Sequence, residues 1–404
     1  MHKKVVIIGT LDTKGEEHLF LKQKIEENGI TTLVMDTGIV GPPFFEPDIS
    51  HHDVCSAAGY TIDELIKKKD RKFGIDVMAM GASKVARRLY EEGHLSGIIS
   101  IGGSQGTYIS SIVMRDLPFG VPKVLVSTTV SGDMSGYVGY KDITLMHSIT
   151  DIVGLHSFNR SLLSQAGSAI CAMMKEDISG EEKEKPLISI TMVGLTTACA
   201  MKIKKLFESK QKIYDLIVFH ARGSGGRAME ELIRDGVIKG VLDVTTKELA
   251  DELVGGIRSA GPHRLEAAGE MGIPQVIGPG GMDMVNFGPR ESIPGKFSGR
   301  KFYVHTPMVT VMRTTVEENK RLGKIVAEKL NRAKGKVIIV LPMKGFSALD
   351  DPNAPFWDLQ CSKAFAKSLK KYVKDSIKVV ELDCHINEDP YAEEVVNQFV
   401  QILP

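Results

Sequence analysis

The feature that most constrains the fold is a short apolar run that turns through glycine straight into a helix. Residues 4–17 read Lys-Val-Val-Ile-Ile-Gly-Thr-Leu-Asp-Thr-Lys-Gly-Glu-Glu, so a buried-type strand ends at Gly9 and helical residues follow at once. The first amide N–H groups of a helix have no partner within it, and the helix dipole draws anions to that end. The opening residues therefore predict a strand, a tight turn and a helix that together hold an anion, phosphate above all.

The same order of strand, glycine turn and helix recurs along the chain. Glycine-rich turns follow other apolar runs at residues 102–107, 223–226 and 278–281. Short runs rich in Val and Ile alternate with amphipathic stretches to the end of the chain, which is the pattern of β-α-β units around mostly parallel sheets. We therefore expect an α/β fold whose glycine turns hold a phosphorylated or otherwise anionic small molecule.

A polar segment near the middle of the chain predicts a boundary between two domains. Residues 175–185 include Ser179-Gly180 and a charged cluster, and Pro186 ends the segment. The 404 residues are many for a single core, and residues 187–197 repeat the strand-glycine-helix order of the N-terminus. We expect domains at residues 1–180 and 186–404, the second being either a related copy or another α/β domain that opens in the same way.

Charge balance and cysteine usage narrow the class of protein. The chain has 51 basic and 50 acidic side chains, a formal charge of +1, so no global field attracts nucleic acid or an anionic membrane. The lysines of residues 367–374 are typical of a solvated helix face. The five cysteines form no CxxC pair, which indicates reduced thiols in the cytoplasm, and no apolar run reaches membrane-spanning length. We expect a soluble cytoplasmic protein.

Side chains of the first turn support an anion site there. Thr13 and Glu16 have capping-box spacing, which predicts that Thr13 caps the helix, and Lys14 puts a cation beside its N-terminus. A well-capped helix without a ligand would show the same pattern.

Polar residues also follow the other predicted strands of the first domain. The turn at residues 102–107 has glycines that let its backbone approach a ligand and hydroxyls that suit phosphate oxygens. Residues 127–133, with Thr128 and Asp133, add hydroxyls and a carboxylate, and Asp36 follows the second strand, where it could meet a ribose hydroxyl or a metal-bound water. In a parallel sheet these turns share one carboxyl edge, where doubly wound folds bind ligands.

The turn at residues 223–228 satisfies the pattern G-x-G-x-x-G/A between a strand and a helix. Asp243 ends the next strand about twenty residues on, which is the context of a dinucleotide-binding fingerprint. Chance in a chain with 40 glycines explains the pattern as well. An NAD(P)-dependent oxidoreductase that uses this turn, with Asp243 on the ribose, therefore stays an alternative.

Charged side chains of the second domain are candidates for catalysis. Asp243 and Glu248 suit an acid, a base or a magnesium ligand, or else a strand-end carboxylate and a helix cap. A histidine before the glycine turn suits an anion partner or a proton carrier. The glycine- and proline-rich residues 278–299 look like a long functional loop. The full set of catalytic candidates is His220, Arg222, Asp243, Glu248, His263 and Glu266.

Taken together, the turns at residues 9–17, 102–107 and 278–283 resemble the uncharacterised family of Tm-1-like ATP-binding proteins, over nearly the whole chain. The resemblance implies two Rossmann-like domains, ATP held with magnesium by the N-terminal one, and a homodimer formed through the C-terminal one. The nucleotide role that it implies falls on Leu11, Asp12, Thr13, Lys14, Gly102, Gly103, Ser104, Gln105, Gly106, Thr107, Ser131 and Gly132. Asp12, Asp36 or Asp133 would hold magnesium through water.

These observations lead to one main hypothesis and two alternatives. The main hypothesis is a cytoplasmic, dimeric ATP-binding protein with two α/β domains, whose interdomain cleft acts on a small anionic substrate. The alternatives are the NAD(P)-dependent oxidoreductase and a non-catalytic interaction protein that a nucleotide regulates. No HExxH or Walker A pattern occurs, so the enzyme classes that depend on those patterns lose support.

Overall fold

The chain divides into two compact units, residues 1–183 (the first domain) and 184–404 (the second domain). The computed structural model describes residues 4–175 and 185–404, so nearly all of the predicted linker lies outside the described residues.

The first domain is built on one parallel sheet of five strands in the order β2-β1-β3-β4-β5. Its strands are β1 (Lys4–Gly9), β2 (Thr31–Asp36), β3 (Gly97–Gly102), β4 (Lys123–Ser127) and β5 (Thr144–His147). Its helices are α1 (Leu11–Glu27), α2 (His51–Ala57), α3 (Ile62–Lys68), α4 (Arg71–Glu91), α5 (Ser104–Asp116), α6 (Ser135–Val138) and α7 (Ser157–Lys175).

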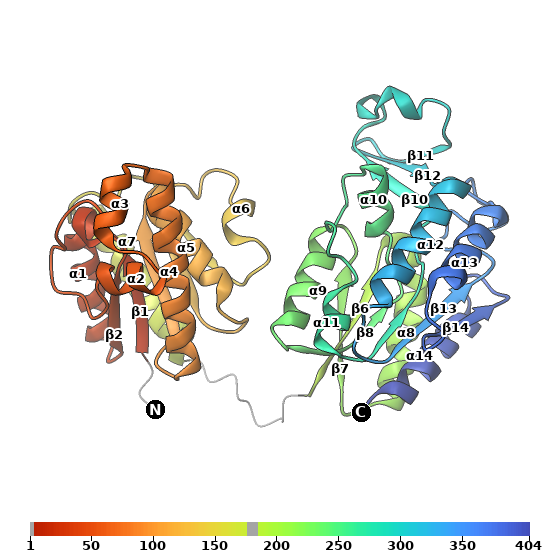
Figure 1. Cartoon of the computed structure of the whole chain (residues 1–404), viewed down its shortest axis with the longest axis horizontal. Coiled ribbons are helices and arrows are strands. Elements are labelled where there is room, and N and C mark those ends of the chain that lie inside the picture. Colours follow the sequence, from red (N-terminus) through yellow and green to blue (C-terminus); the bar gives the residue numbers. More distant parts are fainter. Residues whose placement is uncertain (1–3, 176–184) are drawn as a thin grey trace. The chain divides into compact units, whose positions relative to one another are not determined.

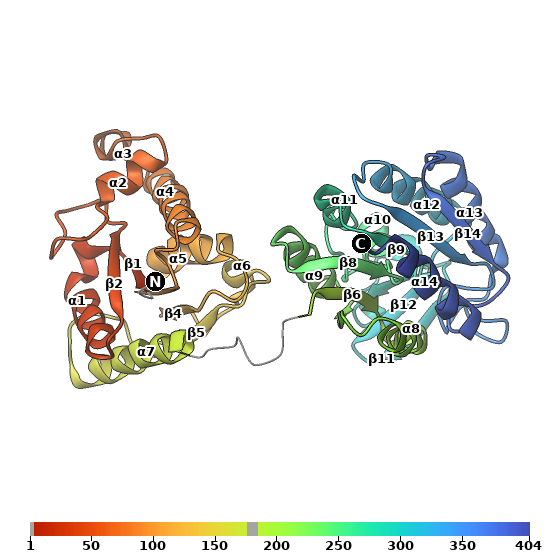
Figure 2. The same cartoon turned by 90° about the horizontal axis from the view of Figure 1, so that it is seen from below.

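Alternate residues of β1 face opposite helical layers, because successive side chains of a strand point to opposite faces. Val5 and Ile7 pack with α1 and α7, whereas Val6 and Ile8 pack with α2, α4 and α5. Figure 2 shows these two layers with the sheet between them. Both faces of the sheet are thus covered, as an all-parallel sheet requires.

The second domain is built on a parallel sheet of six strands in the order β14-β13-β9-β8-β6-β7. Its strands are β6 (Leu187–Met192), β7 (Asp215–His220), β8 (Ile238–Asp243), β9 (Gln275–Ile277), β13 (Val337–Pro342) and β14 (Lys378–Leu382). Helices α8 (Thr197–Lys210) and α14 (Asp389–Ile402) cover one face. The other face packs against α9 (Ser224–Arg234), α10 (Glu248–Val254), α11 (Ala267–Met271), α12 (Val316–Leu330) and α13 (Leu359–Tyr372).

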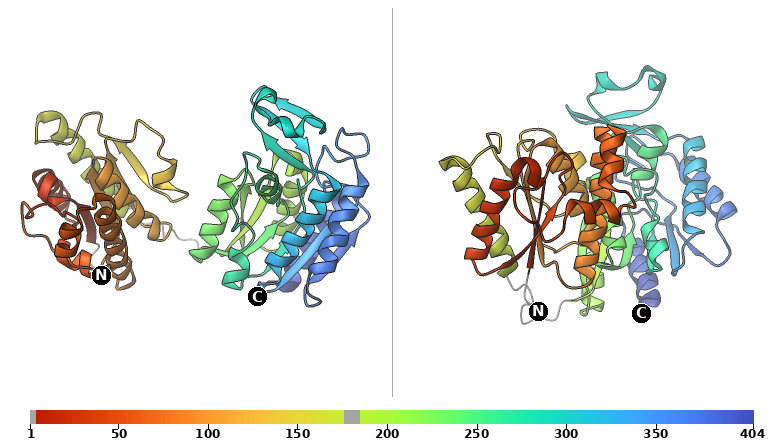
Figure 3. Two further views of the ribbon diagram at one scale, coloured as in Figure 1. Left: turned by 45° about the horizontal axis from the view of Figure 1, so that its top comes forward. Right: turned by 60° about the vertical axis from the view of Figure 1, so that its left-hand side comes forward.

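A small antiparallel sheet, β10 (Met284–Phe287), β12 (Val309–Arg313) and β11 (Phe302–Thr306), stands at one end of the second domain (Figures 1 and 3). The expectation of a long functional loop at residues 278–299 is therefore wrong for its first part, which enters the buried strand β10. Short 3-10 turns follow at Arg290–Ser292 and Gly295–Phe297.

The glycine turn at residues 278–281 is closed by backbone carbonyl groups. The amide N–H groups of Gly278, Gly280 and Gly281 donate to the carbonyl oxygens of Asp243, Val244 and Phe346. This turn is therefore part of the packed framework, and the prediction that it binds an anion is wrong.

The two large sheets share one strand order. Read from its β7 edge, the second sheet runs second, first, third and fourth along its own chain, as the first sheet does from its β2 edge. This is a common doubly wound order, so the prediction of an α/β fold with two Rossmann-like domains and mostly parallel sheets is confirmed.

Three expectations from composition can be checked on the described residues. All five cysteines are buried and free of disulfide bonds. Lys367, Lys370 and Lys371 are exposed along α13, as predicted for a solvated face. Within residues 4–175 and 185–404, no helix combines the length and apolar character needed to cross a membrane.

Candidate functional site

The strand order marks one place in each domain where a ligand can reach several loops. In a doubly wound sheet the connections leave the first strand in opposite directions, and a crevice opens at the carboxyl ends of the strands where they part. This switch point lies between β1 and β3 in the first domain and between β6 and β8 in the second. The turns after Gly9, Gly102 and Ser127 follow neighbouring parallel strands, so they share one edge as predicted.

The turn between β3 and α5 presents open amide groups at the first switch point. Gly103 is the N-cap of the 13-residue helix α5 and supplies no side-chain cap. Within the described chain, no acceptor bonds the amide N–H groups of Ser104, Gln105 or Gly106. Because the helix dipole adds positive potential there, the turn can accept an anion.

Polar groups next to this turn suit the same role. The hydroxyl of Thr128 lies beside Gly103, 3.8 Å from where a Cβ would stand. Arg71, at the start of α4, donates from Nη2 to Oε1 of Gln105 at 3.4 Å, which puts a guanidinium beside the turn. The sequence analysis missed Arg71, since nothing in the local pattern at residue 71 relates it to a turn more than thirty residues away.

Thr107 and Ser127 lie beneath this turn. Thr107 Oγ1 and Ser127 Oγ are 2.6 Å apart, and both side chains are fully buried. Gly102 allows β3 and α5 to pack closely, because a Cβ at this position would lie only 3.1 Å from Cα of Gly106. The predicted cofactor role of Thr107 and Gly102 is therefore corrected to a supporting one.

The first turn of the chain is filled by its own carboxylate. Asp36 is fully buried, and its Oδ1 accepts the amide N–H groups of Leu11 at 3.0 Å and Gly38 at 2.8 Å. Its Oδ2 lies 3.0 Å from Nδ1 of His51. The predictions that Leu11 contacts a phosphate and that Asp36 meets a ribose or a metal are therefore wrong in this structure.

Thr13 and Lys14 also have partners within the first domain. Helix α1 begins at Leu11 with Thr10 as N-cap, so Thr13 lies inside the first turn and the predicted capping box is wrong. The Thr13 hydroxyl lies 2.8 Å from that of Thr10. Lys14 Nζ donates to the carbonyl oxygen of Ile152 at 2.5 Å, so the lysine ties α1 to the segment after β5.

The remaining predicted ligands of the first domain lie in an exposed loop. Ser131, Gly132 and Asp133 are exposed in the segment after β4, and the amide of Gly132 donates to the carbonyl of Thr129. Asp133 Oδ1 accepts the amide of Ser135 at 2.9 Å. These residues follow the strand next to the open turn and stay candidates for nucleotide contact.

The three carboxylates predicted to hold magnesium do not form a cluster. Among the described residues, no group of three His, Cys, Asp or Glu side chains is placed to hold a metal ion. Asp12 Oδ2 accepts the amides of Ile39, Val40 and Gly41, while its Oδ1 is buried without a partner. Asp12 is thus the one of the three with a buried oxygen left unbonded.

In the second domain, the turn with the dinucleotide pattern is filled by Glu248. Gly223 has a φ of 89°, which glycine adopts readily, and it is the N-cap of α9. The amides of Gly223 and Gly226 donate to Glu248 Oε1 at 2.5 and 3.2 Å. A Cβ on Gly226 would collide with the same carboxylate. Glu248 thus occupies the position that the pyrophosphate of a dinucleotide would take, and the structure contradicts the NAD(P) alternative.

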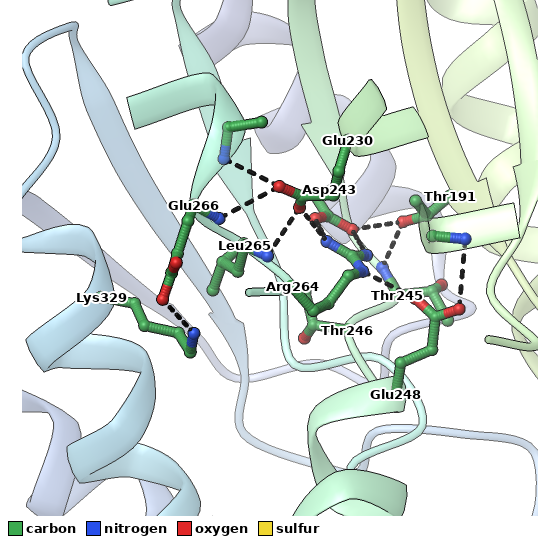
Figure 4. Close-up of polar contacts among 12 residues, drawn as sticks. Thr191, Glu230, Asp243, Thr245, Thr246, Glu248, Arg264, Leu265, Glu266 and Lys329 are labelled. Carbon is green, nitrogen blue, oxygen red and sulfur yellow. Dashed lines mark hydrogen bonds and ion pairs between the residues drawn. The ribbon is translucent and has the colours of Figure 1, made fainter. Parts of the chain in front are cut away.

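Glu248 belongs to a buried ion cluster around Arg264, which Figure 4 shows. Arg264 donates from Nε to Glu248 at 2.6 Å, from Nη1 and Nη2 to Asp243 at 2.5 and 2.7 Å, and from Nη1 to Glu230 at 3.3 Å. Thr191 donates to Asp243 at 2.8 Å. Asp243 and Glu248 therefore bind a guanidinium and are closed to solvent, which corrects their predicted catalytic roles.

The electrostatics of this cluster follow from burial and from an excess of negative charge. Burial raises the pKa of Glu248, and the neighbouring Asp243 adds to this effect, while Arg264 opposes it. The carboxylates hold the pKa of Arg264 well above its usual value despite burial. The catalytic candidates from the sequence include neither Arg264 nor Glu230, since only the fold brings positions 230, 243, 248 and 264 together.

His263 and Glu266 form a separate pair at the edge of the cluster. His263 Nδ1 lies 3.0 Å from Glu266 Oε2, and Lys329 donates to Glu266 Oε1 at 2.5 Å. These bonds lower the pKa of Glu266 although its partial burial works against them. A carboxylate paired on both sides fixes α11 against α12 and is a poor proton carrier.

His220 and Arg222 lie elsewhere, at the carboxyl end of β7. Partial burial lowers the pKa of His220, and the nearby cations Arg222, Arg258 and Lys247 lower it further. The six predicted catalytic residues therefore fall into three groups, an ion cluster, a surface pair and a cationic rim.

Known protein families and relatives match this chain along nearly all of its length. The model of the N-terminal domain of the uncharacterised protein family UPF0261 matches residues 3–179, and that of its C-terminal domain matches residues 185–403. A UPF0261 protein of Clostridium tetani is 48% identical over 404 residues, which cover 100% of both chains.

A tomato protein is a more distant relative. The ToMV resistance protein Tm-1(GCR237) of Solanum lycopersicum is 35% identical over 426 residues, covering 99% of this chain and 56% of the tomato protein. This match and those to the family models confirm the resemblance that the glycine turns indicate. The chain spans little more than half of that relative.

Among solved structures, UDP-N-acetylglucosamine 2-epimerase from Rickettsia bellii aligns with 100% of this chain and 96% of its own. The identity is 12% and the TM-score is 0.23, so this similarity carries no argument about function.

Proposed function

The chain belongs to the uncharacterised protein family UPF0261, and on that premise we propose that its first domain binds ATP at the turn between β3 and α5. The observation that carries the proposal is the set of three amide N–H groups, of Ser104, Gln105 and Gly106, that no acceptor of the described chain bonds. They lie at the switch point of a doubly wound sheet, where nucleotides bind in such folds.

Phosphate fits this turn better than an uncharged ligand does. Unbonded amides at the start of a 13-residue helix favour negative charge, and the guanidinium of Arg71 beside Gln105 adds a cation. Arg71 is exposed, so it can turn toward a phosphate without breaking a buried contact. The Thr128 hydroxyl next to Gly103 can donate to a phosphate oxygen.

Magnesium would accompany the nucleotide. The unbonded Oδ1 of Asp12 fits a magnesium ligand, and this ion usually combines one or two carboxylates with phosphate oxygens and water. The bound ion supplies positive charge that offsets the charge of the phosphates. ATP is chosen over other nucleotides on the resemblance to Tm-1-like proteins.

The proposal includes a cytoplasmic location and a homodimer. Five buried, unpaired cysteines suit a reducing compartment. In the second domain β11 is an edge strand with exposed Tyr303 and Val304, which suits pairing with a second copy.

Titration of the full chain with ATP and magnesium, followed by calorimetry, tests the proposal. The decisive variant is Gly103→Asp, which puts a carboxylate at the N-cap, where it can bond the amides as Asp36 does at α1. We expect ATP affinity to fall at least about tenfold, or ~1.4 kcal/mol, while the helix keeps a good cap.

Gly103→Ala is the matched control. Its Cβ would meet only the Thr128 hydroxyl at 3.8 Å, and the φ of −84° suits alanine, so the fold and ATP binding should persist. ATP binding that is equally tight in Gly103→Asp would overturn the proposal, as would no binding by the unaltered chain. Formation of ADP in the same samples would distinguish an ATPase from a protein that only binds the nucleotide.

A further inference from the structure

We propose that the second domain has its own site for a small oxyanion, at its switch point between β6 and β8. The site is formed by Arg222, Arg258 and His220 at its rim and by Asn286 in its wall. It is separate from the nucleotide turn of the first domain and from the ion cluster around Arg264.

Two arginines of this site form no ion pair with a described carboxylate. Arg264, Arg300 and Arg313 of the same domain each pair with a carboxylate. No described carboxylate forms an ion pair with the side chain of Arg222 or Arg258. Burial lowers the pKa of Arg258, Arg222 lowers it further, and the charge of Asp251 offsets only part of this. Unpaired neighbouring guanidinium groups repel each other, and a bound anion would remove that repulsion.

Two polar atoms of the site are also unbonded. Asn286 is only 3% exposed, and its Oδ1 has no hydrogen-bond partner. Nδ1 of His220 is likewise buried and unbonded. A buried polar atom without a partner is costly, so both atoms indicate a missing ligand that can donate to Asn286 as well as accept from the rim.

A small cavity lies against Arg258 and Asn286. It measures about 40 Å³, and Gly194, Lys247, Arg258, Asn286 and His305 are among the residues that line it. The ammonium of Lys247 is bonded to Asp251 at 2.5 Å, so Arg258 is the lining cation left to meet an anion. A nucleoside is far larger than this cavity, whereas one phosphate or carboxylate group is of its size.

The chemistry therefore identifies a small phosphorylated or carboxylated molecule that also has a hydroxyl group. Its oxyanion would accept from Arg222 and Arg258, and its hydroxyl would donate to Oδ1 of Asn286. A Cβ added at Gly194, just after β6, would meet nothing within 4 Å, so a ligand can approach the backbone there.

Calorimetry with glycerol 3-phosphate, and with inorganic phosphate in parallel, tests the proposal. The full chain is used in the Gly103→Asp background, so that the first-domain turn cannot account for binding. We expect glycerol 3-phosphate to bind and Arg258→Gln to weaken it at least about tenfold. Arg222→Gln, which alters an exposed side chain, should also weaken it. Tighter binding of glycerol 3-phosphate than of inorganic phosphate would support the hydroxyl contact with Asn286.

Arg332→Gln is the control, since Arg332 is exposed in the same domain and its replacement changes the net charge equally. Its binding should equal that of the background. If Arg258→Gln unfolds, Arg222→Gln decides alone. The proposal would be overturned if neither Arg258→Gln nor Arg222→Gln weakened binding, or if Arg332→Gln weakened it equally. It would also be overturned if neither glycerol 3-phosphate nor inorganic phosphate bound.

Discussion

At residue 103 the turn into α5 offers its amide groups to an incoming anion, whereas at residue 223 the turn into α9 is already bonded to Glu248. Both turns follow a parallel strand, both contain closely spaced glycines, and both open a helix. The difference lies in a side chain far along the chain. The amides of a glycine turn can accept a ligand only where no carboxylate or carbonyl group of the same protein bonds them first.

The first turn of the chain supports the same lesson. Leu11 donates to Asp36, which lies 25 residues further on, and Gly223 donates to Glu248, also 25 residues further on. Asp36 ends the next strand, β2, and Glu248 begins the helix that follows the next strand, β8. A folded chain can thus supply from within the negative charge that a helix N-terminus favours.

The largest test of this difference removes the guanidinium that holds the filled turn together. Arg264→Met leaves Asp243, Glu248 and Glu230 buried without their cation, so we expect a loss of about 3–5 kcal/mol in the free energy of unfolding of the second domain. Hydrogen exchange resolved by domain measures this loss. Arg332→Met, at an exposed position, is the control, and equal stability of the two variants would show that the cluster is unimportant.

An intermediate test compares one alanine in each turn. In Gly226→Ala the new methyl group collides with the Glu248 carboxylate, so we expect a cost of about 1–3 kcal/mol. Gly103→Ala meets no such group and should cost below about 1 kcal/mol. Urea denaturation of both variants provides the comparison. Equal costs would mean that the two turns are filled alike.

The smallest test uses pH, because protonation alters one group and leaves the packing in place. The pKa of Glu248 lies above its ordinary 4.5 through burial, so its contribution to second-domain stability is full in acid and is lost as pH rises through that raised value. The pKa of His18, buried beneath Gly9, lies below its ordinary 6.5, so first-domain stability is lost as pH falls below 6.5.

The two domains should therefore respond to pH in opposite directions. Hydrogen exchange at several pH values, read separately for each domain, measures both slopes. Glu248→Gln should reduce the slope of the second domain, where burial also raises the pKa values of Asp283 and Asp350, and leave that of the first unchanged. Parallel slopes in both domains would contradict the assignment.

The fold could be predicted from the sequence because it depends on local patterns. Apolar runs of strand length alternate with amphipathic helices, and the apolar runs near residues 336–341 and 377–382 form β13 and β14. The apolar side chains at helical spacing in residues 390–403 lie in α14. Each pattern lies within a few residues, so no tertiary contact is needed to recognise it.

The candidate site could be predicted only in part. The sequence placed Gly103, Ser104, Gln105, Gly106 and Thr128 near one another, and β3 and β4 do bring them together. It did not reveal that Asp36 and Glu248 fill two of the other turns, since each contact joins residues 25 positions apart. Nor did it reveal Arg264 as the partner of Asp243, because the strength of a charge pair depends on burial that only packing decides.

Because the Glu248 carboxylate closes the turn at Gly223, the stability of this turn does not require a bound ligand. A turn that depends on a dissociable metabolite loosens when the supply of that metabolite falls. A turn that is closed by a side chain of its own chain does not depend on the concentration of any ligand. It therefore stays formed whether metabolite levels are low or high.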